Sequence, residues 1–142
     1  MKIAIGSDHA GYSLKTRIIE LLKKEVELVK DYGPSTEESV DYADYAHPLA
    51  EAVESKVYDF GILICGSGNG INMTANKHQG IRSALCWQED IAVLARQHNN
   101  ANILVLPARF ITENIALSIV KLFITTEFEG GRHEKRVNKI PC

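Results

Sequence analysis

The sequence predicts a single-domain α/β fold in which a doubly wound, five-stranded parallel sheet is flanked by helices. Three observations support this fold class. Five short apolar runs alternate along the chain with segments of helical periodicity. The run at residues 60–65 is apolar throughout rather than at every second position, as in strands that are covered on both faces. The 142 residues suit one domain, residues 1–142, with neither an internal repeat nor a linker.

The first half of the chain alternates strand, helix, strand and helix. Residues 2–6 (KIAIG) are a short apolar run that ends in a glycine, which is typical of a buried strand. Residues 12–24 repeat leucine and isoleucine at helical spacing, and residues 26–33 (VELVKDYG) supply a second strand and a turn. After a loop that contains Pro34, apolar residues at 46, 49, 50 and 53 mark a second helix. Pro48 would be tolerated there only in the first turn.

The second half of the chain repeats this alternation. Residues 60–65 (FGILIC) are apolar throughout and are expected at the centre of the sheet. A helix from about Gly70 to His78, a strand at 82–87, a helix at 90–98 and a strand at 102–107 are expected to follow. Thr112 is expected to cap a last helix, because its hydroxyl can accept a hydrogen bond from the first turn. The tail from residue 129 is polar and basic.

Helical crossovers between the strands imply a parallel sheet, for which we expect the strand order 2-1-3-4-5. In such sheets ligands bind outside the carboxyl ends of the strands. The loops that follow the first, third and fifth strands are therefore the places where a site is expected. Their sequences are SDHAG, GSGNG and ARF.

Composition excludes several classes of protein. The chain is 45% hydrophobic and 24% charged, and its net charge of −2 predicts neither a nucleic-acid partner nor an anionic membrane partner. The apolar run at the N-terminus is too short for a signal peptide, and no later run reaches the roughly 18 residues of a membrane span. Three widely spaced cysteines fit neither a disulfide framework nor a zinc site. A cytoplasmic location is therefore expected.

The glycine loop after the third strand, residues 66–70 (GSGNG), admits three interpretations. A dinucleotide loop would read G-x-G-x-x-G after the first strand, whereas here the spacing is G-x-G-x-G after the third. A plain tight turn is compatible with the spacing. So is an anion-binding loop, because glycines let successive backbone N–H groups converge where a helix begins.

Cys65 immediately precedes this loop. A cysteine that closes a buried strand is usually an inert small hydrophobe. Backbone N–H donors and a helix N-terminus can nevertheless lower the pKa of a thiol, which would make Cys65 reactive. Cys86 also ends a strand but has no glycine loop, so a structural role is expected. Cys142 is terminal and is expected to be exposed.

Two further groups of residues are candidates for binding. Asp8 and His9 follow the first strand and are expected on the same rim as Cys65, where Asp8 could alternatively serve only as a helix cap. Arg132 and Arg136 are spaced four apart, so one helical turn would put both guanidinium groups on one face. Such a pair can hold a phosphate monoester, although a solvated basic tail is the simpler interpretation.

His98 and Asn99 end the helix that leads into the fifth strand, which places them near the amino end of that strand. A strand of four or five residues is roughly 15 Å long, so they should lie far from Cys65 within one chain. They are either structural or belong to a site completed by a neighbouring chain.

Five motifs together resemble the type B ribose-5-phosphate isomerases, a family that includes the subunits of galactose-6-phosphate isomerase. The motifs run in order across nearly the whole chain: GSDHAG, CGSGNGI, ANK…GIR, RQHNNANIL and EGGRHEKR. The resemblance implies a Rossmann-like fold, no metal or cofactor, and homodimers or tetramers with sites between subunits. It implies interconversion of ribose 5-phosphate and ribulose 5-phosphate through a cis-enediolate, in the non-oxidative branch of the pentose phosphate pathway.

The resemblance also implies a role for each candidate residue. Cys65 would be the base that moves the substrate proton, and His98 would assist opening of the sugar ring. The Ser67 hydroxyl and the amides of the glycine loop would form an anion hole, and the remaining residues would hold substrate hydroxyls and phosphate. The substrate-binding residues would be Asp8, His9, Gly66, Gly68, Asn69, Gly70, Asn99, Arg109, Arg132 and Arg136.

Two positions depart from the family pattern. Many members have threonine where this chain has Ser67, which keeps the hydroxyl. Another branch uses a glutamate after the glycine loop as the base, but that position is Ile71 here, so Cys65 is the only candidate of the two. Two alternatives remain open: an isomerase of a six-carbon substrate such as allose 6-phosphate or galactose 6-phosphate, and a phosphate- or nucleotide-sensing module without chemistry.

Overall fold

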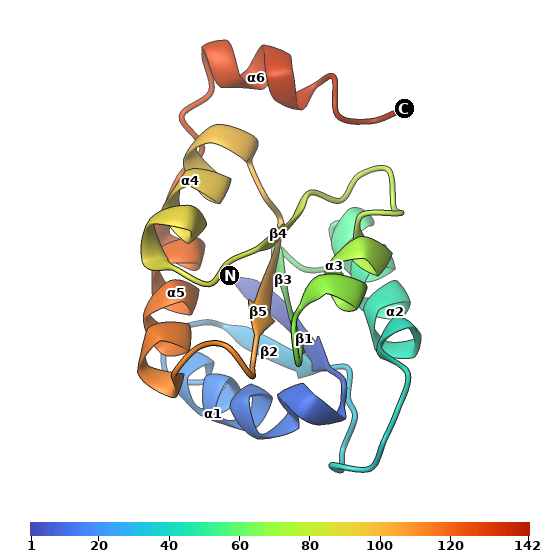
Figure 1. The fold of residues 1–142 in the computed structure, drawn as a ribbon. Helices are drawn as coiled ribbons and strands as arrows, with labels where there is room; N and C mark the ends of the chain where they lie inside the picture. Colours follow the sequence, from blue (N-terminus) through green and yellow to red (C-terminus); the bar gives the residue numbers. More distant parts are fainter.

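The computed structural model describes residues 1–142 and confirms the predicted fold class (Figure 1). A five-stranded sheet, parallel in every pairing, lies between two layers of helices. The strands are β1 (Lys2–Ser7), β2 (Leu28–Asp31), β3 (Phe60–Cys65), β4 (Ser83–Leu85) and β5 (Ile103–Pro107). The helices are the short 3₁₀ helix η1 (His9–Gly11), α1 (Tyr12–Leu22), α2 (Tyr42–Glu54), α3 (Asn69–Ala75), α4 (Glu89–Asn99), α5 (Glu113–Thr125) and α6 (Arg132–Val137).

The strand order is β2-β1-β3-β5-β4, so the expected order 2-1-3-4-5 is wrong in its last two positions. β3 pairs with β5 along its length, from Gly61 beside Ile103 to Cys65 beside Pro107. β5 is buried throughout, whereas β4 has three residues and is only partly buried. The more apolar strand therefore takes the interior place and the short strand takes the edge. The expected central position of β3 is confirmed.

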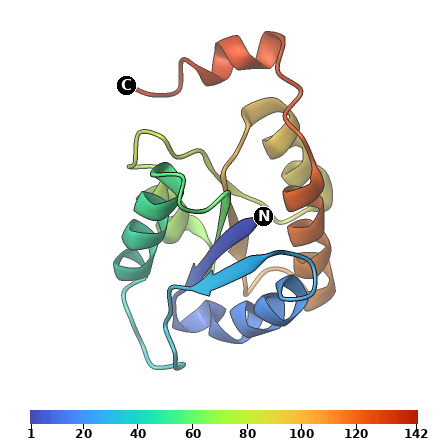
Figure 2. The same ribbon diagram turned by 180° about the vertical axis from the view of Figure 1, so that it is seen from behind.

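Alternating side chains of the central strands divide the core into two clusters, one on each face of the sheet. Ile62 and Ile64 point toward the layer that contains α1, α4 and α5. Leu63 and Cys65 point toward α2 and α3 on the opposite face. Seen from behind, the same two layers appear on exchanged sides (Figure 2). The alternation places Cys65 at the end of β3 on the same face as α3, the helix that follows it.

Several element boundaries differ from expectation. Pro48 lies inside α2 rather than in its first turn, because the helix already begins at Tyr42. Its ring is exposed, so the carbonyl that loses its donor lies on the solvent side of the helix.

The expected cap is confirmed, since the Thr112 hydroxyl accepts a hydrogen bond from the amide of Ile115 at 3.3 Å. None of the helices combines the length and the apolar character that crossing a bilayer demands.

Candidate functional site at the carboxyl end of the sheet

The loops that follow β1, β3 and β5 meet at the carboxyl end of the sheet, as predicted. The amide of Asp8 donates to the carbonyl of Ile64 at 3.0 Å, which extends the pairing of β1 with β3 beyond the strand. The amide of Arg109 donates to the carbonyl of Gly66 at 3.0 Å, which does the same for β5 and β3. The backbone therefore holds the three loops in one fixed arrangement around Cys65.

The glycine loop is both a tight turn and the start of α3. Gly68 is the residue that caps this helix, and its φ of 78° is in the left-handed region that favours glycine. A side chain there would also overlap Leu85 at the end of β4. At Gly66 a Cβ atom would lie 3.1 Å from Nη1 of Arg109, so the guanidinium group rests directly on the loop backbone. The absence of side chains thus brings a cation onto the loop that follows Cys65.

Cys65 is 7% exposed, and its environment does not lower the pKa of the thiol as the glycine loop suggested. Burial raises the pKa above the ordinary value of 9.0, and the carboxylate of Asp8 raises it further by repelling a thiolate. Hydrogen bonds from the amides of Gly68 and Ile71 lower the pKa of Cys65, but by less than burial and Asp8 raise it. Cys65 in the free protein is therefore a mostly protonated thiol whose thiolate, once formed, is a strong base.

We expect alkylation of Cys65 by iodoacetamide to accelerate with rising pH and to reach its midpoint above pH 9.0, because only the thiolate reacts. Asp8→Asn removes the repelling charge and should move this midpoint to lower pH. Mass spectrometry of the peptide that contains Cys65 measures the rate, and the exposed Cys142 serves as an internal reference. A midpoint below pH 9.0 for Cys65 would contradict the assigned environment.

The other predicted residues of this rim have defined contacts. The Asp8 carboxylate caps η1 by accepting from the amide of Gly11 at 3.1 Å, so it is a helix cap and a neighbour of Cys65 at once. Nδ1 of His9 accepts from the amide of Val40 at 3.3 Å. The Ser67 hydroxyl accepts from the amide of Asn69 at 3.3 Å, and both side chains are exposed to a ligand.

A buried lysine, Lys15, holds the loop after β2 next to this rim through hydrogen bonds. Lys15 is 1% exposed, and its Nζ donates to both Asp31 oxygens, at 2.8 and 3.0 Å, and to the carbonyl of Pro34 at 2.6 Å. The loop that Lys15 holds also accepts the amide of Ser7, through the carbonyl of Gly33 at 3.0 Å. Sequence reasoning missed this contact, since Lys15 lies in an otherwise ordinary amphipathic helix.

An apolar pocket of about 450 Å³ adjoins the glycine loop. Ser67 and Asn69 form its polar side, and the exposed aromatic rings of Trp87 and Phe110 form part of its apolar side. Both residues follow the carboxyl ends of strands, and this position could have identified them from the sequence as site residues. Neither was predicted as one. The pocket gives the rim a wall against which a ligand or a second chain can pack.

The remaining predicted residues lie at the opposite end of the sheet. α4 ends at Asn99, and the carbonyl of Asn102 accepts from the amide of Gly61, at the amino end of β3. Cys65 is four residues further along that strand, or about 13 Å at 3.3 Å per residue. α6, which carries Arg132 and Arg136, lies beyond the amino ends of the strands (Figure 1). The expected separation of His98 from Cys65 within one chain is confirmed.

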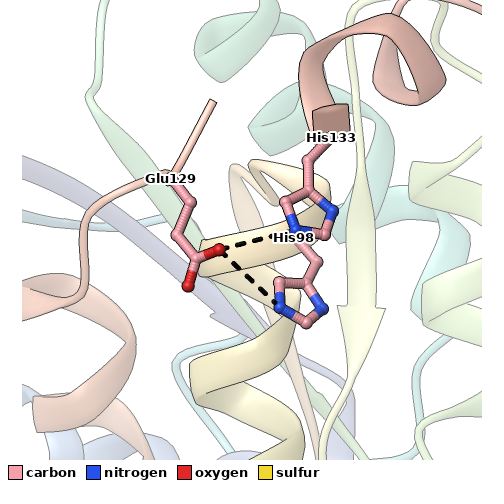
Figure 3. A group of neighbouring side chains, drawn as sticks. All are labelled: His98, Glu129 and His133. Carbon is pink, nitrogen blue, oxygen red and sulfur yellow. Dashed lines mark ion pairs between the residues drawn. The ribbon is translucent and has the colours of Figure 1, made fainter. Parts of the chain in front are cut away.

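α6 places Arg132 and Arg136 one turn apart, as their spacing predicted, and leaves both exposed. It also brings His133 against His98, with ring centroids 4.1 Å apart and ring planes 9° from parallel (Figure 3). Glu129 faces both rings. Glu129 and His133 were not among the predicted site residues, because only the tertiary packing of the tail on α4 brings them to His98.

A five-stranded doubly wound sheet with a cysteine, an acid and a glycine loop at its carboxyl end defines a candidate small-molecule site of an α/β enzyme fold. The sequence model of the Ribose/Galactose Isomerase family matches residues 3–140. The chain therefore belongs to this family.

Individual relatives agree with the family assignment. Ribose-5-phosphate isomerase B of Escherichia coli is 43% identical over 140 residues, which cover 98% of this chain and 93% of the relative. The crystal structure of a ribose 5-phosphate isomerase from Thermotoga maritima matches with a TM-score of 0.96 at 51% identity, covering 99% of this chain and 97% of the other. Ribose-5-phosphate isomerase B from Mycoplasma genitalium, solved with bound ribulose-5-phosphate, matches with a TM-score of 0.94 at 46% identity over 98% of this chain and 93% of the other.

Proposed function

We propose that this chain interconverts ribose 5-phosphate and ribulose 5-phosphate as an aldose–ketose isomerase in the pentose phosphate pathway of the cytoplasm. The observation that carries the proposal is the position of Cys65, a buried thiol beside Asp8 and next to the Gly66–Gly70 loop on which Arg109 rests. Relatives that match over nearly the full chain are named for this reaction, and one structure among them holds ribulose-5-phosphate.

In the proposed reaction the Cys65 thiolate removes the proton from C2 of the open-chain aldose. The C–H electron pair forms the C1–C2 double bond of a cis-enediolate while the C1=O1 π pair moves onto O1. The O2 hydroxyl proton then passes to O1, and the same thiol returns the carbon proton to C1 as the C2=O2 bond forms, which gives the ketose. General-base catalysis of this kind is typically worth about 10²–10⁴-fold. The raised pKa of Cys65 reduces the thiolate population but increases its basicity toward a weakly acidic C–H bond.

Negative charge develops on the carbonyl oxygen as the enediolate forms. We propose that the amides of Gly66, Gly68, Asn69 and Gly70, with the Ser67 hydroxyl, stabilise this charge. One such donor commonly lowers the barrier by about 3–4 kcal/mol. Asp8 and His9 would contact substrate hydroxyls, since both lie on the same rim as Cys65.

The second half of the proposed site comes from a neighbouring chain in a homodimer, alone or paired into a tetramer. Within one chain His98, Asn99, Arg132 and Arg136 lie about one strand length from Cys65, so they cannot reach the same five-carbon substrate. A two-fold dimer can bring the amino end of one sheet to the carboxyl end of the other. The arginines would then bind the phosphate group, together with Arg109 and His9.

The proposal is tested by assaying turnover of a panel of aldose phosphates, with ribose 5-phosphate expected to have the highest kcat/KM. A higher kcat/KM for allose 6-phosphate or galactose 6-phosphate would instead identify a six-carbon isomerase. Absence of turnover together with tight binding of phosphate esters or nucleotides would identify a sensing module and overturn the proposal. Protection of Cys65 from iodoacetamide by ribulose 5-phosphate provides a binding measurement that does not depend on turnover.

His98→Asn should slow turnover of the ribose 5-phosphate furanose more than turnover of open-chain ribulose 5-phosphate, because only the former needs ring opening. A general acid–base group is worth roughly 10²–10⁴-fold, so the loss in the ribose direction should be large. Steady-state kinetics in both directions, with pre-equilibrated anomers, measure the difference. An equal fall of kcat in the two directions would argue against a ring-opening role, whereas kcat/KM must fall by the same factor in both directions because the equilibrium constant does not change.

A further inference from the structure

The strongest unassigned feature is the group formed by His98, Glu129 and His133, called here the tail cluster. His98 lies in the last turn of α4, Glu129 precedes the bend at Gly130–Gly131, and His133 lies in the first turn of α6. The amide of Glu129 donates to the carbonyl of Gln97 at 3.0 Å, which holds the tail against α4. Both glycines have positive φ, 66° and 55°, so the bend returns His133 toward Glu129.

The donor atoms of the tail cluster converge. Oε2 of Glu129 lies 3.4 Å from Nε2 of His133 and 4.0 Å from Nε2 of His98 (Figure 3). One ligand atom from each of the three residues lies within 4.8 Å of the others. Ligands of a tetrahedral zinc ion with bonds of about 2.0–2.1 Å are separated by about 3.3 Å. Shifts of about an ångström would therefore bring the three atoms to coordination distance.

His133 provides an independent indication of a ligand. Its side chain is only 8% exposed, and its Nε2 is one of the few buried polar atoms with no hydrogen-bond partner. Buried polar atoms in folded proteins nearly always have a partner. Nε2 of His133 is therefore available to bind a metal ion.

The stacked rings of His98 and His133 must tilt relative to one another before both can bind one ion. Because the planes are nearly parallel, the two Nε2 lone pairs do not yet meet at one point. His98 is 36% exposed and its ring makes no hydrogen bond, so it can tilt toward Glu129 while His133 stays fixed in its buried position. The arginines of α6 oppose a cation, which favours weaker binding than at a closed structural zinc site.

We propose that the tail cluster is a binding site for a divalent transition-metal ion of the zinc type, with two imidazole nitrogens and one carboxylate oxygen as ligands. Two histidines and a glutamate form a ligand set that zinc accepts, with the fourth position left to water. The consequence for activity rests on the proposed function. If His98 acts as the acid–base group of ring opening, the bound ion occupies its nitrogen and inhibits turnover of ribose 5-phosphate.

The test compares the metal-free full chain with two variants. Zn²⁺ is titrated calorimetrically into the wild type, Glu129→Gln and Glu127→Gln, and the isomerase assay is repeated at each Zn²⁺ concentration. Glu129 is half exposed, so its replacement should fold normally, and the metal-free turnover of each variant is the reference for its own inhibition curve. We expect the variant to need at least about tenfold more Zn²⁺ for half-saturation, as is usual when a metal site is damaged. Glu127 is a matched control, since it is exposed on the same tail but outside the cluster.

A second measurement separates the tail cluster from the cysteines and from the pair His47 and His78, whose ring nitrogens are 2.9 Å apart. Co²⁺ bound at the tail cluster should show visible d–d bands without a thiolate charge-transfer band, and His47→Asn should leave the spectrum unchanged. A thiolate band that disappears in Cys65→Ala, or equal Zn²⁺ affinity in wild type and Glu129→Gln, would overturn the site. Binding lost in Glu129→Gln but without inhibition in the wild type would support the site and overturn the role of His98.

Discussion

Turnover of Cys65→Ala is expected to fall by at least about 10²–10⁴-fold, because alanine cannot take a proton from the substrate. Binding of ribulose 5-phosphate should be nearly unchanged, since Arg109 and the glycine loop do not depend on the thiol for their positions. Their arrangement comes from backbone hydrogen bonds, such as that from the amide of Arg109 to Gly66 at 3.0 Å. Single-turnover kinetics and calorimetric titration separate the two quantities.

Two controls accompany this prediction. Cys142→Ala changes an exposed terminal thiol and should keep wild-type turnover. The melting temperature of Cys65→Ala reports any loss of packing, because Cys65 belongs to the core cluster on the α2–α3 face. A variant that folds normally and keeps more than a few per cent of the wild-type rate would show that another group is the base.

Mixing two inactive variants is expected to restore activity. Cys65→Ala damages the carboxyl-end half of the site, and the double variant Arg132→Glu with Arg136→Glu damages the amino-end half. Hydrogen bonds to charged groups contribute about 1.5–3 kcal/mol each, so the double variant should lose at least a hundredfold in kcat/KM. Random pairing after subunit exchange should restore about a quarter of wild-type activity, because half of the dimers are mixed and each has one intact site.

The control for this experiment uses two variants with damage in the same half. Cys65→Ala mixed with Asp8→Asn should show no more activity than the average of the two variants assayed separately, since every site in the mixed dimer lacks one of two groups that belong to the same rim. Assays at substrate concentrations well below KM report kcat/KM, which includes the contribution of phosphate binding. Failure of the first mixture, with subunit exchange verified by mass spectrometry, would show that one chain holds the whole site or that the arginines do not bind the phosphate.

Local patterns were sufficient for most of the fold. The apolar run at 60–65 predicted a central strand, and the structure places β3 between β1 and β5. The exchange of β4 and β5 could not be derived from connectivity, because helical crossovers allow either order. Composition did favour the observed order. β4 is short and contains Ser83, whereas residues 103–107 are all apolar and all buried, as suits an interior strand.

The site was predicted less completely than the fold. Chain order relative to the strands was enough to place Asp8, Cys65 and Arg109 on one rim, because the carboxyl ends of parallel strands share an edge. The pKa of Cys65 was not predictable in direction, since glycine-loop amides and burial act oppositely and their balance depends on depth. Glu129 and His133 escaped notice because their partner, His98, lies some thirty residues away in the sequence.

By itself the sequence determined the fold class, the rim on which Cys65 lies and the distance between Cys65 and His98 in one chain. These properties follow from strand periodicity and strand length, which are local and depend on few residues. Only the tertiary structure decided the strand order, the raised pKa of Cys65 and the contact of the tail with α4. Each of these depends on burial and on long-range packing, which residues distant in the chain create together.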